Sequence, residues 1–278
     1  MDNKLYATRS TRLRSTVAAL AMAATGFVAV GAQADMANGI VDQWDVGVVG
    51  QFLCGTAVAT APGAFTCAAT TMNWGSNGTS GLDITNAGAS IVNTNGAAVG
   101  NLSVTHRNQA INAPSLDSVS LRSALTLTPF MPSAPGLPTA TLDFLIDFLE
   151  TPNGADPCAN GAANGVGVND DGCGDIFVID QAALNFAFQY DLGGGVGPIT
   201  YFVSFFEQSG GLSPLASAAC TAAGVTPPCL GFVTPEGEDT TFQFAAVITT
   251  EQVQIPVPGT LASVGLGLLL LGLRRRRV

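Results

Sequence analysis

Basic residues are almost absent from the middle of this 278-residue sequence. Only Arg107 and Arg122 lie between Asp35 and Gln254, where there is no lysine and where nineteen residues are acidic, so that stretch has a formal net charge of −17. Such an acidic surface repels phosphate groups, which excludes binding to nucleic acid as a function. The same charge would attract divalent cations or basic partners, or it would simply keep an exported protein soluble.

Side chains suited to nucleophilic catalysis or to zinc binding are also scarce. His106 is the single histidine, no serine lies in a Gly-x-Ser-x-Gly elbow, and no cysteines are spaced as Cys-x-x-Cys. The run Gly193–Gly197 is not followed by the Lys-Ser/Thr of a phosphate loop. The sequence therefore predicts a protein that is not an enzyme.

Two hydrolase alternatives remain at this stage. One is a site that uses His106. The other is a glycosidase-type pair of carboxylates that lie on two different strands. Glu150, Glu207, Glu236 or Glu238 could supply one member of such a pair. No motif in the sequence indicates either site.

The N-terminal residues have the composition of an export signal. Four basic residues precede an apolar run over 17–30, and Ala32-Gln33-Ala34 then provides a small-x-small cleavage site. This order is that of a secretory signal peptide, so residues 1–34 are predicted to be removed; a retained N-terminal anchor is the alternative.

The last 24 residues combine three features of a membrane-directed tail. A short turn motif, Pro256, Val257, Pro258 and Gly259, leads into an apolar run over 260–273, which ends at Arg274, Arg275, Arg276 and Arg277. Counted from Ile255, nineteen residues are long enough to cross a bilayer core of about 30 Å if the proline-containing part lies among the headgroups. The arginine cluster is expected to remain cytoplasmic and to stop the segment there.

This tail resembles the PEP-CTERM sorting signal of exported bacterial proteins. A second match lies upstream, where Thr105, His106 and Asn108 fit the T-H-x-N signature of one PEP-CTERM subfamily. The resemblance implies an exosortase-type processing enzyme as a partner and a C-terminal membrane anchor. Val257 stands where that family usually has glutamate, which leaves cleavage of the tail open. We expect an exported protein, anchored in the membrane by its C-terminal segment and placed at the cell surface or in the extracellular matrix if it is processed.

Residues 35–254 are predicted to form one all-β ectodomain. Alternation over 141–150 places Leu142, Phe144, Ile146 and Phe148 on one face of a strand. Further strands are expected at 119–121, 125–128, 175–179 and 240–250, with a hairpin formed by 184–190 and 199–206 around a glycine-rich tip. Short strands joined by Gly/Pro turns predict an antiparallel β-sandwich or a jelly-roll-like fold, followed by a short C-terminal transmembrane helix over the tail.

Three further expectations concern particular segments of this ectodomain. Trp44 and Phe52 are early core candidates. Residues 75–100 are predicted to be turn-rich or to form short edge strands, because Gly, Asn and Thr dominate there. Residues 129–138 contain four prolines and are predicted to be an extended or turning connector.

The six cysteines form three pairs that are close in sequence. Six cysteines allow fifteen connectivities, but this clustering favours the local bridges Cys54–Cys67, Cys158–Cys173 and Cys220–Cys229. An exported chain meets oxidising conditions, so disulfides are the expected state.

One loop offers oxygen ligands for a hard cation. Asn169, Asp170, Asp171 and Asp175 lie together with glycines between them, and calcium prefers carboxylate and amide oxygens. The spacing does not match an EF-hand, and a turn rich in Asp, Asn and Gly is the structural alternative. Calcium is therefore the possible cofactor.

The role of the T-H-x-N residues stays open between catalysis, ligand contact and structural hydrogen bonding. The most consistent function is a non-enzymatic exported surface or extracellular-matrix protein that carries a PEP-CTERM, exosortase-type signal. The alternative is a calcium-dependent module that binds extracellular polysaccharide, although two tryptophans and three tyrosines offer few platforms for sugars.

Overall fold

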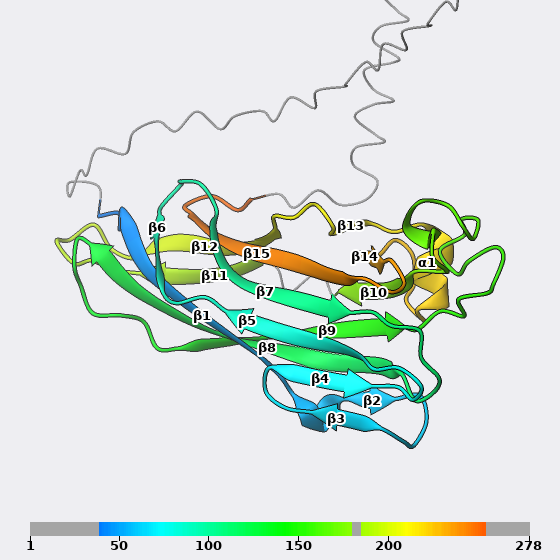
Figure 1. Cartoon of the computed structure of the whole chain (residues 1–278). Coiled ribbons are helices and arrows are strands. Elements are labelled where there is room, and N and C mark those ends of the chain that lie inside the picture. The colour runs from blue at the N-terminus through cyan, green and yellow to red at the C-terminus, as the bar shows by residue number, and fades with distance from the viewer. Residues whose placement is uncertain (1–38, 180–184, 254–278) are drawn as a thin grey trace, which may run out of the picture.

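The computed structural model describes residues 39–179 and 185–253 (Figure 1). The predicted signal peptide over 1–34 and the sorting tail over 255–278, with its transmembrane helix, lie outside these residues. Within the described residues, no helix has the length and apolarity needed to cross a membrane.

The described chain folds into two antiparallel β-sheets that pack as a sandwich (Figure 1). The first sheet has the order β13-β14-β10-β9-β8-β1-β6, and β2 also pairs with β8. Its strands are β1 (Gln43–Phe52), β2 (Val58–Ala59), β6 (Ser90–Asn93), β8 (Leu116–Met131), β9 (Ala140–Leu149), β10 (Asp175–Ile179), β13 (Ser213–Pro214) and β14 (Leu230–Thr234).

The second sheet has the order β11-β12-β15-β7-β5-β4-β3. Its strands are β3 (Phe65–Cys67), β4 (Thr71–Trp74), β5 (Ser80–Asn86), β7 (Val99–Arg107), β11 (Asn185–Tyr190), β12 (Ile199–Glu207) and β15 (Asp239–Thr249). The short helices are η2 (Cys54–Thr56), η3 (Gly167–Asn169) and α1 (Ser217–Ala222). The all-β, two-sheet antiparallel fold expected from the sequence is thus confirmed.

Period-two alternation explains why these segments form strands with one buried face. In β9, Phe144, Ile146 and Phe148 are buried against the second sheet, whereas Asp143 and Leu145 are exposed. The expected hairpin is also confirmed, because β11 and β12 pair antiparallel with Tyr190 opposite Ile199.

Two segments differ from the sequence-based expectation. Pro129 was assigned to a connector, but β8 continues through it to Met131 and pairs there with Trp44 of β1. The stretch 75–100 contains β5, which is not an edge strand but lies between β4 and β7. The buried side chains Leu82 and Ile84 on the inner face of β5 outweigh the low strand propensity of the surrounding glycines and asparagines.

All three predicted disulfides are present. Cys54 is bonded to Cys67, Cys158 to Cys173, and Cys220 to Cys229, and the described residues include no free cysteine. The Cys220–Cys229 bond ties α1 to the start of β14, and the Cys158–Cys173 bond closes the long loop between β9 and β10. Disulfides of this kind are consistent with an extracellular protein.

Both tryptophans of the sequence are buried, one toward each end of the sandwich. Trp44 lies on β1 among Phe188, Tyr190 and Tyr201, all in edge-on contact with it. Trp74, at the end of β4, stacks on His106 and also contacts Phe148.

Candidate metal centre

Three carboxylates meet at the end of the sandwich where Trp74 lies. Glu150, Asp175 and Glu236 each place a carboxylate oxygen within 4.8 Å of the other two. Asp175 is fully buried, Glu236 is 4% exposed and Glu150 is half-buried. Among the described residues this is the one group of three or more His, Cys, Asp or Glu side chains with metal-binding geometry. We call these three residues the carboxylate cluster.

The pairing of the strands brings the carboxylate cluster together. Glu150 follows β9 directly, and Asp175 opens β10, whose Ile176 pairs with Leu149. Asp175 in turn lies opposite Thr234, the last residue of β14, and Glu236 follows in the turn that leads from β14 to β15. That turn crosses from the first sheet to the second, so the cluster lies where the two sheets are joined.

Most of the acceptor capacity of the cluster is unused. Glu150 Oε2, Asp175 Oδ2 and Glu236 Oε1 are buried and have no hydrogen-bond partner. Asp175 Oδ1, by contrast, accepts a hydrogen bond from the Thr151 backbone N–H at 2.8 Å. A buried acceptor without a donor costs about 1–3 kcal/mol, and more when it is charged. Three such oxygens facing one another therefore need either protons or a cation.

The pKa values of these three carboxyl groups also indicate that the cluster disfavours negative charge. Burial, and then the neighbouring Glu236, raise the pKa of Glu150 to about 7, although Trp74 opposes the shift. Burial and then Glu150 hold the pKa of Asp175 well above its usual range. Burial also raises the pKa of Glu236, although Asn153 and the Gly237 N–H oppose this. All three shifts have the sign expected when like charges share a desolvated site.

Two asparagines complete the polar shell of the cluster. Asn108 is fully buried, and its side chain lies close enough to Asp175 to lower that pKa slightly. Its Nδ2 donates to the Pro235 carbonyl at 3.0 Å, whereas its Oδ1 has no partner. Asn153, with its amide nitrogen turned toward the cluster, donates to Glu236 Oε2 at 2.9 Å and to the Thr151 carbonyl at 3.3 Å. Turning that amide over would instead present Oδ1 to the same position.

The T-H-x-N residues lie beside this cluster, at the end of β7. His106 is fully buried, and its Nδ1 lies 3.0 Å from the Thr234 hydroxyl, while its Nε2 has no partner. Burial, and then the nearby Arg107 charge, lower the pKa of His106 to about 3, so the imidazole is neutral. Rings of Trp74, Phe148 and Phe177 surround it.

Thr105 points away from His106, as alternation along a strand requires. Its hydroxyl pairs with that of Thr241 at 2.8 Å on the outer face of the second sheet. The three residues of the signature therefore do not form one site, because His106 and Asn108 face the Trp74 end of the core and Thr105 does not.

The four residues predicted to bind calcium do not come together in one site either. Of Asn169, Asp170, Asp171 and Asp175, only Asp175 belongs to the carboxylate cluster, and Asp170 and Asp171 are exposed. Asn169 is buried, but its amide is occupied: Oδ1 accepts from the Gly174 N–H at 3.0 Å, and Nδ2 donates to Asn160 and to the Ala163 carbonyl. The structure thus places these four residues in three different environments.

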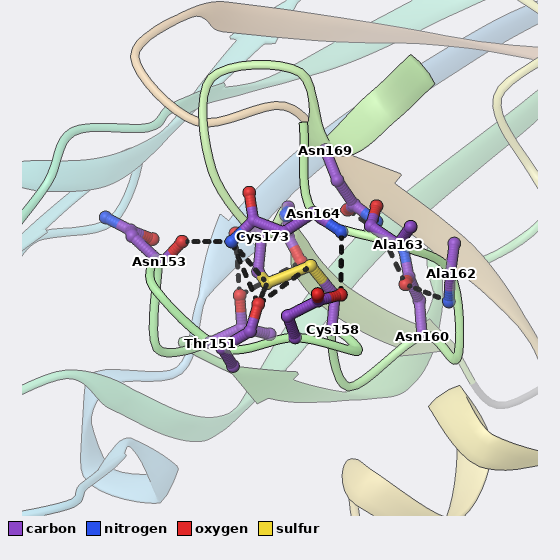
Figure 2. Close-up of a disulfide and its surroundings, with 12 residues drawn as sticks. Thr151, Asn153, Cys158, Asn160, Ala162, Ala163, Asn164, Asn169 and Cys173 are labelled. Carbon is purple, nitrogen blue, oxygen red and sulfur yellow. Dashed lines mark hydrogen bonds between the residues drawn. A yellow bond between two sulfur atoms is a disulfide. The ribbon is translucent and has the colours of Figure 1, made fainter. Parts of the chain in front are cut away.

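The disulfide loop supports the cluster from outside (Figure 2). Asn164 donates to the carbonyls of Asn153 and Ala155, and the Thr151 hydroxyl donates to the Cys173 carbonyl at 2.7 Å. Figure 2 shows these bonds around the Cys158–Cys173 bridge, which fixes the segment that carries Asn153. The loop therefore positions the wall of the cluster.

The type of ligand atom determines which cation the carboxylate cluster can bind, and here the ligand atoms are oxygens. Three carboxylates, joined by the Asn153 amide oxygen if that side chain turns over, are ligands of the kind that calcium prefers, at 2.3–2.6 Å and with flexible geometry. Zinc sites in proteins are built mainly from imidazole and thiolate ligands. No histidine or cysteine belongs to the cluster. The arrangement is therefore suited to calcium.

Sequence reasoning named Glu150 and Glu236 only as partners for a carboxylate pair across strands, and not as metal ligands. The feature of the sequence that distinguishes them is their position relative to the strands. Glu150 comes directly after an apolar strand, and Glu236 comes two residues after another. Charged residues at such positions usually reach solvent, but both of these are partly or fully buried.

Comparison with known protein families finds no match for this chain, and comparison with curated proteins finds none either.

Proposed function

We propose that this protein is a non-enzymatic exported surface or extracellular-matrix protein whose β-sandwich binds one calcium ion. The ion would sit in the carboxylate cluster and tie the two sheets together at the turn between β14 and β15. The observation that carries the proposal is the convergence of Glu150, Asp175 and Glu236 within 4.8 Å, with one buried oxygen of each unpaired.

Calcium removes the electrostatic cost of this arrangement. Three carboxylates that share a desolvated site cannot all ionise without a counter-charge. Since Arg107 and Arg122 are the only basic residues over 35–254, and both are paired with aspartates elsewhere, a metal cation is the counter-charge best placed to serve the cluster.

The burial of candidate catalytic groups supports a non-enzymatic role. His106 is fully buried, neutral and surrounded by rings, so it is not placed to take a proton from a substrate. The carboxylates approach one another closely, as in a retaining glycosidase, but Asp175 is fully buried and Glu236 nearly so, which leaves a sugar no route to them.

The polysaccharide-binding alternative has less support than a structural calcium ion. Both tryptophans are buried in the core, so neither provides an exposed platform for a sugar ring. We therefore assign calcium a structural role and place adhesion, if any, on the outer faces of the sandwich.

Export and anchoring rest on the two ends of the sequence. The signal peptide over 1–34 and the PEP-CTERM-like tail over 255–278 support delivery to the envelope, with an exosortase-type enzyme as the processing partner. Intact-mass measurement of the protein from membrane and medium fractions tests this. A species running from Asp35 to a cut near Pro258 in the medium indicates processing, and one running from Asp35 to Val278 in the membrane alone indicates a retained anchor. Recovery of the protein only from cytosol contradicts the proposal.

Thermal unfolding with and without calcium tests the metal site. After chelation, calcium at a hundredfold its Kd should stabilise the protein by about 2.7 kcal/mol, which corresponds to roughly 5–10 °C in Tm for a domain of this size. Asp175→Asn should abolish this gain. Asp171→Asn is the matched control, because Asp171 is exposed on the same loop and outside the cluster.

Two outcomes would overturn the assignment. One is a Tm that calcium does not move in the wild-type protein. The other is loss of the calcium effect in Asp171→Asn and not in Asp175→Asn, which would return the site to the exposed part of the loop.

A further inference from the structure

The end of the sandwich that buries Trp44 carries exposed apolar side chains. Phe130 and Met131, at the end of β8, are 51% and 45% exposed, and Val196, in the turn between β11 and β12, is 56% exposed. Among the described residues, Phe130 is the only aromatic side chain that is exposed to this degree. We call Phe130, Met131 and Val196 the apolar tip.

The first described residues of the chain connect the two parts of the apolar tip. The backbone N–H of Asp42 donates to the Met131 carbonyl at 2.8 Å. Gly39 lies directly against Val196, because a Cβ at Gly39 would come within 3.0 Å of that side chain. The segment over 39–42 thus runs from the β11–β12 turn to the end of β8, and the apolar tip is one region of the surface.

The loops at this end of the molecule are uncharged. Neither 129–142, which includes the loop after β8, nor 192–206, which includes the β11–β12 turn, contains a charged residue. The Tyr190 hydroxyl donates to the Pro135 carbonyl at 2.6 Å and so ties the hairpin to the loop after β8. At the opposite end, the segment over 150–175 carries five carboxylates. Because charged groups resist leaving water, only the Trp44 end is suited to contact with an apolar phase.

The C-terminal segment of the chain leaves from the same end. β15 ends at Thr249, and the next residue, Thr250, donates its N–H to Asn95 Oδ1 at 3.0 Å. Figure 1 shows the end of β15, the arrowhead of β8 and the β11–β12 hairpin on one side of the molecule and α1 on the other. Six residues, 254–259, separate the described chain from the apolar run over 260–273. Six residues reach about 20 Å at most, so a membrane that holds this run lies close to the apolar tip.

We propose, on the basis of the anchoring proposed above for the tail, that the apolar tip inserts into the surface of the membrane that holds the tail. Three apolar side chains bind a bilayer only weakly by themselves. A short tether, however, gives the tip a high effective concentration at the membrane, so that even a weak contact is occupied. The sandwich then stands on the bilayer with its Trp44 end, and the carboxylate cluster faces away from it.

Acidic residues around the apolar tip limit its depth and determine the lipid that suits it. Asp42 bonds to Met131, Asp191 accepts from the Gly193 N–H in the hairpin turn, and Glu251 follows β15. Carboxylates remain at the level of the headgroups, so the tip reaches only about 5–10 Å into the boundary between headgroups and acyl chains. The net charge of −17 over 35–254 is repelled by anionic lipids, so a zwitterionic bilayer is the appropriate probe.

Fluorescence quenching by brominated lipid tests the proposal with the whole mature chain, residues 35–278, in phosphatidylcholine vesicles. Phe130→Trp places a tryptophan in the apolar tip. Val166→Trp is the matched control, because Val166 is 63% exposed in the loop between β9 and β10 at the opposite end. Both positions are exposed, so both variants should keep the fold. After subtraction of the wild-type emission, acyl-chain bromines should remove about half of the emission added at position 130 and none of that added at position 166.

Vesicle flotation separates this proposal from the anchoring on which it rests. If the chain floats with the vesicles but shows no quenching at position 130, or equal quenching at both positions, insertion of the tip is wrong and anchoring by the tail stands. If the chain does not float, anchoring is contradicted, and insertion of the tip with it.

A further pair of substitutions tests whether the apolar side chains themselves hold the tip in the bilayer. Met131→Ser and Val196→Ser, added together to Phe130→Trp, should reduce the quenching at least twofold and leave flotation unchanged, because the tail still anchors the chain. Quenching that stays at the level of Phe130→Trp alone overturns the proposal.

Discussion

The two ends of this sandwich each bury a tryptophan, but they treat polar groups in opposite ways. At one end, Trp44 Nε1 donates to the Thr94 hydroxyl at 3.1 Å, that hydroxyl donates to the Val41 carbonyl, and the Val41 N–H donates to Tyr201 Oη at 2.8 Å. These hydrogen bonds form one chain that passes through Val41.

At the other end, the corresponding groups are unpaired. Trp74 Nε1 and His106 Nε2 have no partner, and neither do Asn108 Oδ1 and one buried oxygen of each carboxylate in the cluster. The Trp44 end is complete with protein atoms alone. The Trp74 end has the polar groups of a binding site, and this contrast is why we place a cation there and not at the Trp44 end.

Matched substitutions of the two tryptophans should give the largest difference between the ends. Trp44→Phe removes ring volume and also leaves the Thr94 hydroxyl without its donor, so we expect a loss of about 3–4 kcal/mol. Trp74→Phe removes an N–H that makes no hydrogen bond of normal geometry, although it lies near the Glu150 carboxylate, and we expect a loss of about 1–2 kcal/mol. Urea unfolding measures both. An equal or larger loss for Trp74→Phe would show that the comparison is wrong.

Removing the Cys158–Cys173 bond should lower both the stability of the fold and its affinity for calcium. The double variant Cys158→Ser/Cys173→Ser loses about 3 kcal/mol by the loop-entropy model. The same variant should also bind calcium at least tenfold more weakly, because the bridge fixes the loop that carries Asn153.

The matched control is Cys54→Ser/Cys67→Ser, which opens a loop of similar length away from the carboxylate cluster. It should cost similar stability and leave the Kd for calcium unchanged. An equal loss of calcium affinity in both double variants would mean that the effect is general destabilisation.

The stability of the protein in the presence of chelator should depend on pH through the carboxylates at the Trp74 end. Because the pKa of Glu150 is raised in the folded state from 4.5 to about 7, the native protein holds a proton that the unfolded chain has lost. Its contribution is complete below pH 4.5 and is lost as the pH rises through about 7. We expect a decrease on the order of 2 kcal/mol across that window, discounted for the partial exposure of Glu150.

Glu150→Gln should flatten this part of the profile, and calcium should reverse the decrease in wild type above pH 7. Urea unfolding at a series of pH values, with chelator and with calcium, measures both effects. Chelated stability that rises from pH 4.5 to 7 would contradict the assignment.

The smallest effect should come from the two arginine–aspartate pairs. Arg122 and Asp143 lie on the outer face of the first sheet and are well exposed, so Arg122→Ala should leave Tm unchanged. Arg107 is more enclosed, because it pairs with Asp83 at 2.6 Å and also donates to Asn73. Arg107→Ala should therefore lower Tm by a small, measurable amount. Thermal melts of the two variants side by side make the test, and a larger drop for Arg122→Ala would contradict it.

Local patterns in the sequence were enough for much of the fold. The alternation of Phe144, Ile146 and Phe148 predicted the buried face of β9, and the short spacing of the cysteines predicted all three disulfides. Local patterns failed where neighbours in space decided the outcome. Pro129 stays in β8 because Trp44 pairs beside it, and β5 is central because β4 and β7 flank it.

The candidate site could be predicted only in part. The acidic loop pointed to Asp175, and the T-H-x-N residues pointed to His106 and Asn108, which do lie beside it. Glu150 and Glu236 were not assigned to the site, because they are 25 and 61 residues from Asp175 in the sequence. A turn between two different sheets brings Glu236 to the cluster, and no periodic pattern encodes such a crossing.

The sequence by itself determined the strands with clear period-two alternation, such as β9, their buried faces and the disulfides, because each depends on residues near one another along the chain. It also determined the strong negative charge of residues 35–254, which no fold can change. Only the tertiary structure decided which acidic residues meet in a desolvated site and which remain in water. Antiparallel pairing of β9, β10 and β14 brings Glu150, Asp175 and Glu236 together and leaves Asp170 and Asp171 exposed, and it is burial that turns these carboxylates into a candidate cation site.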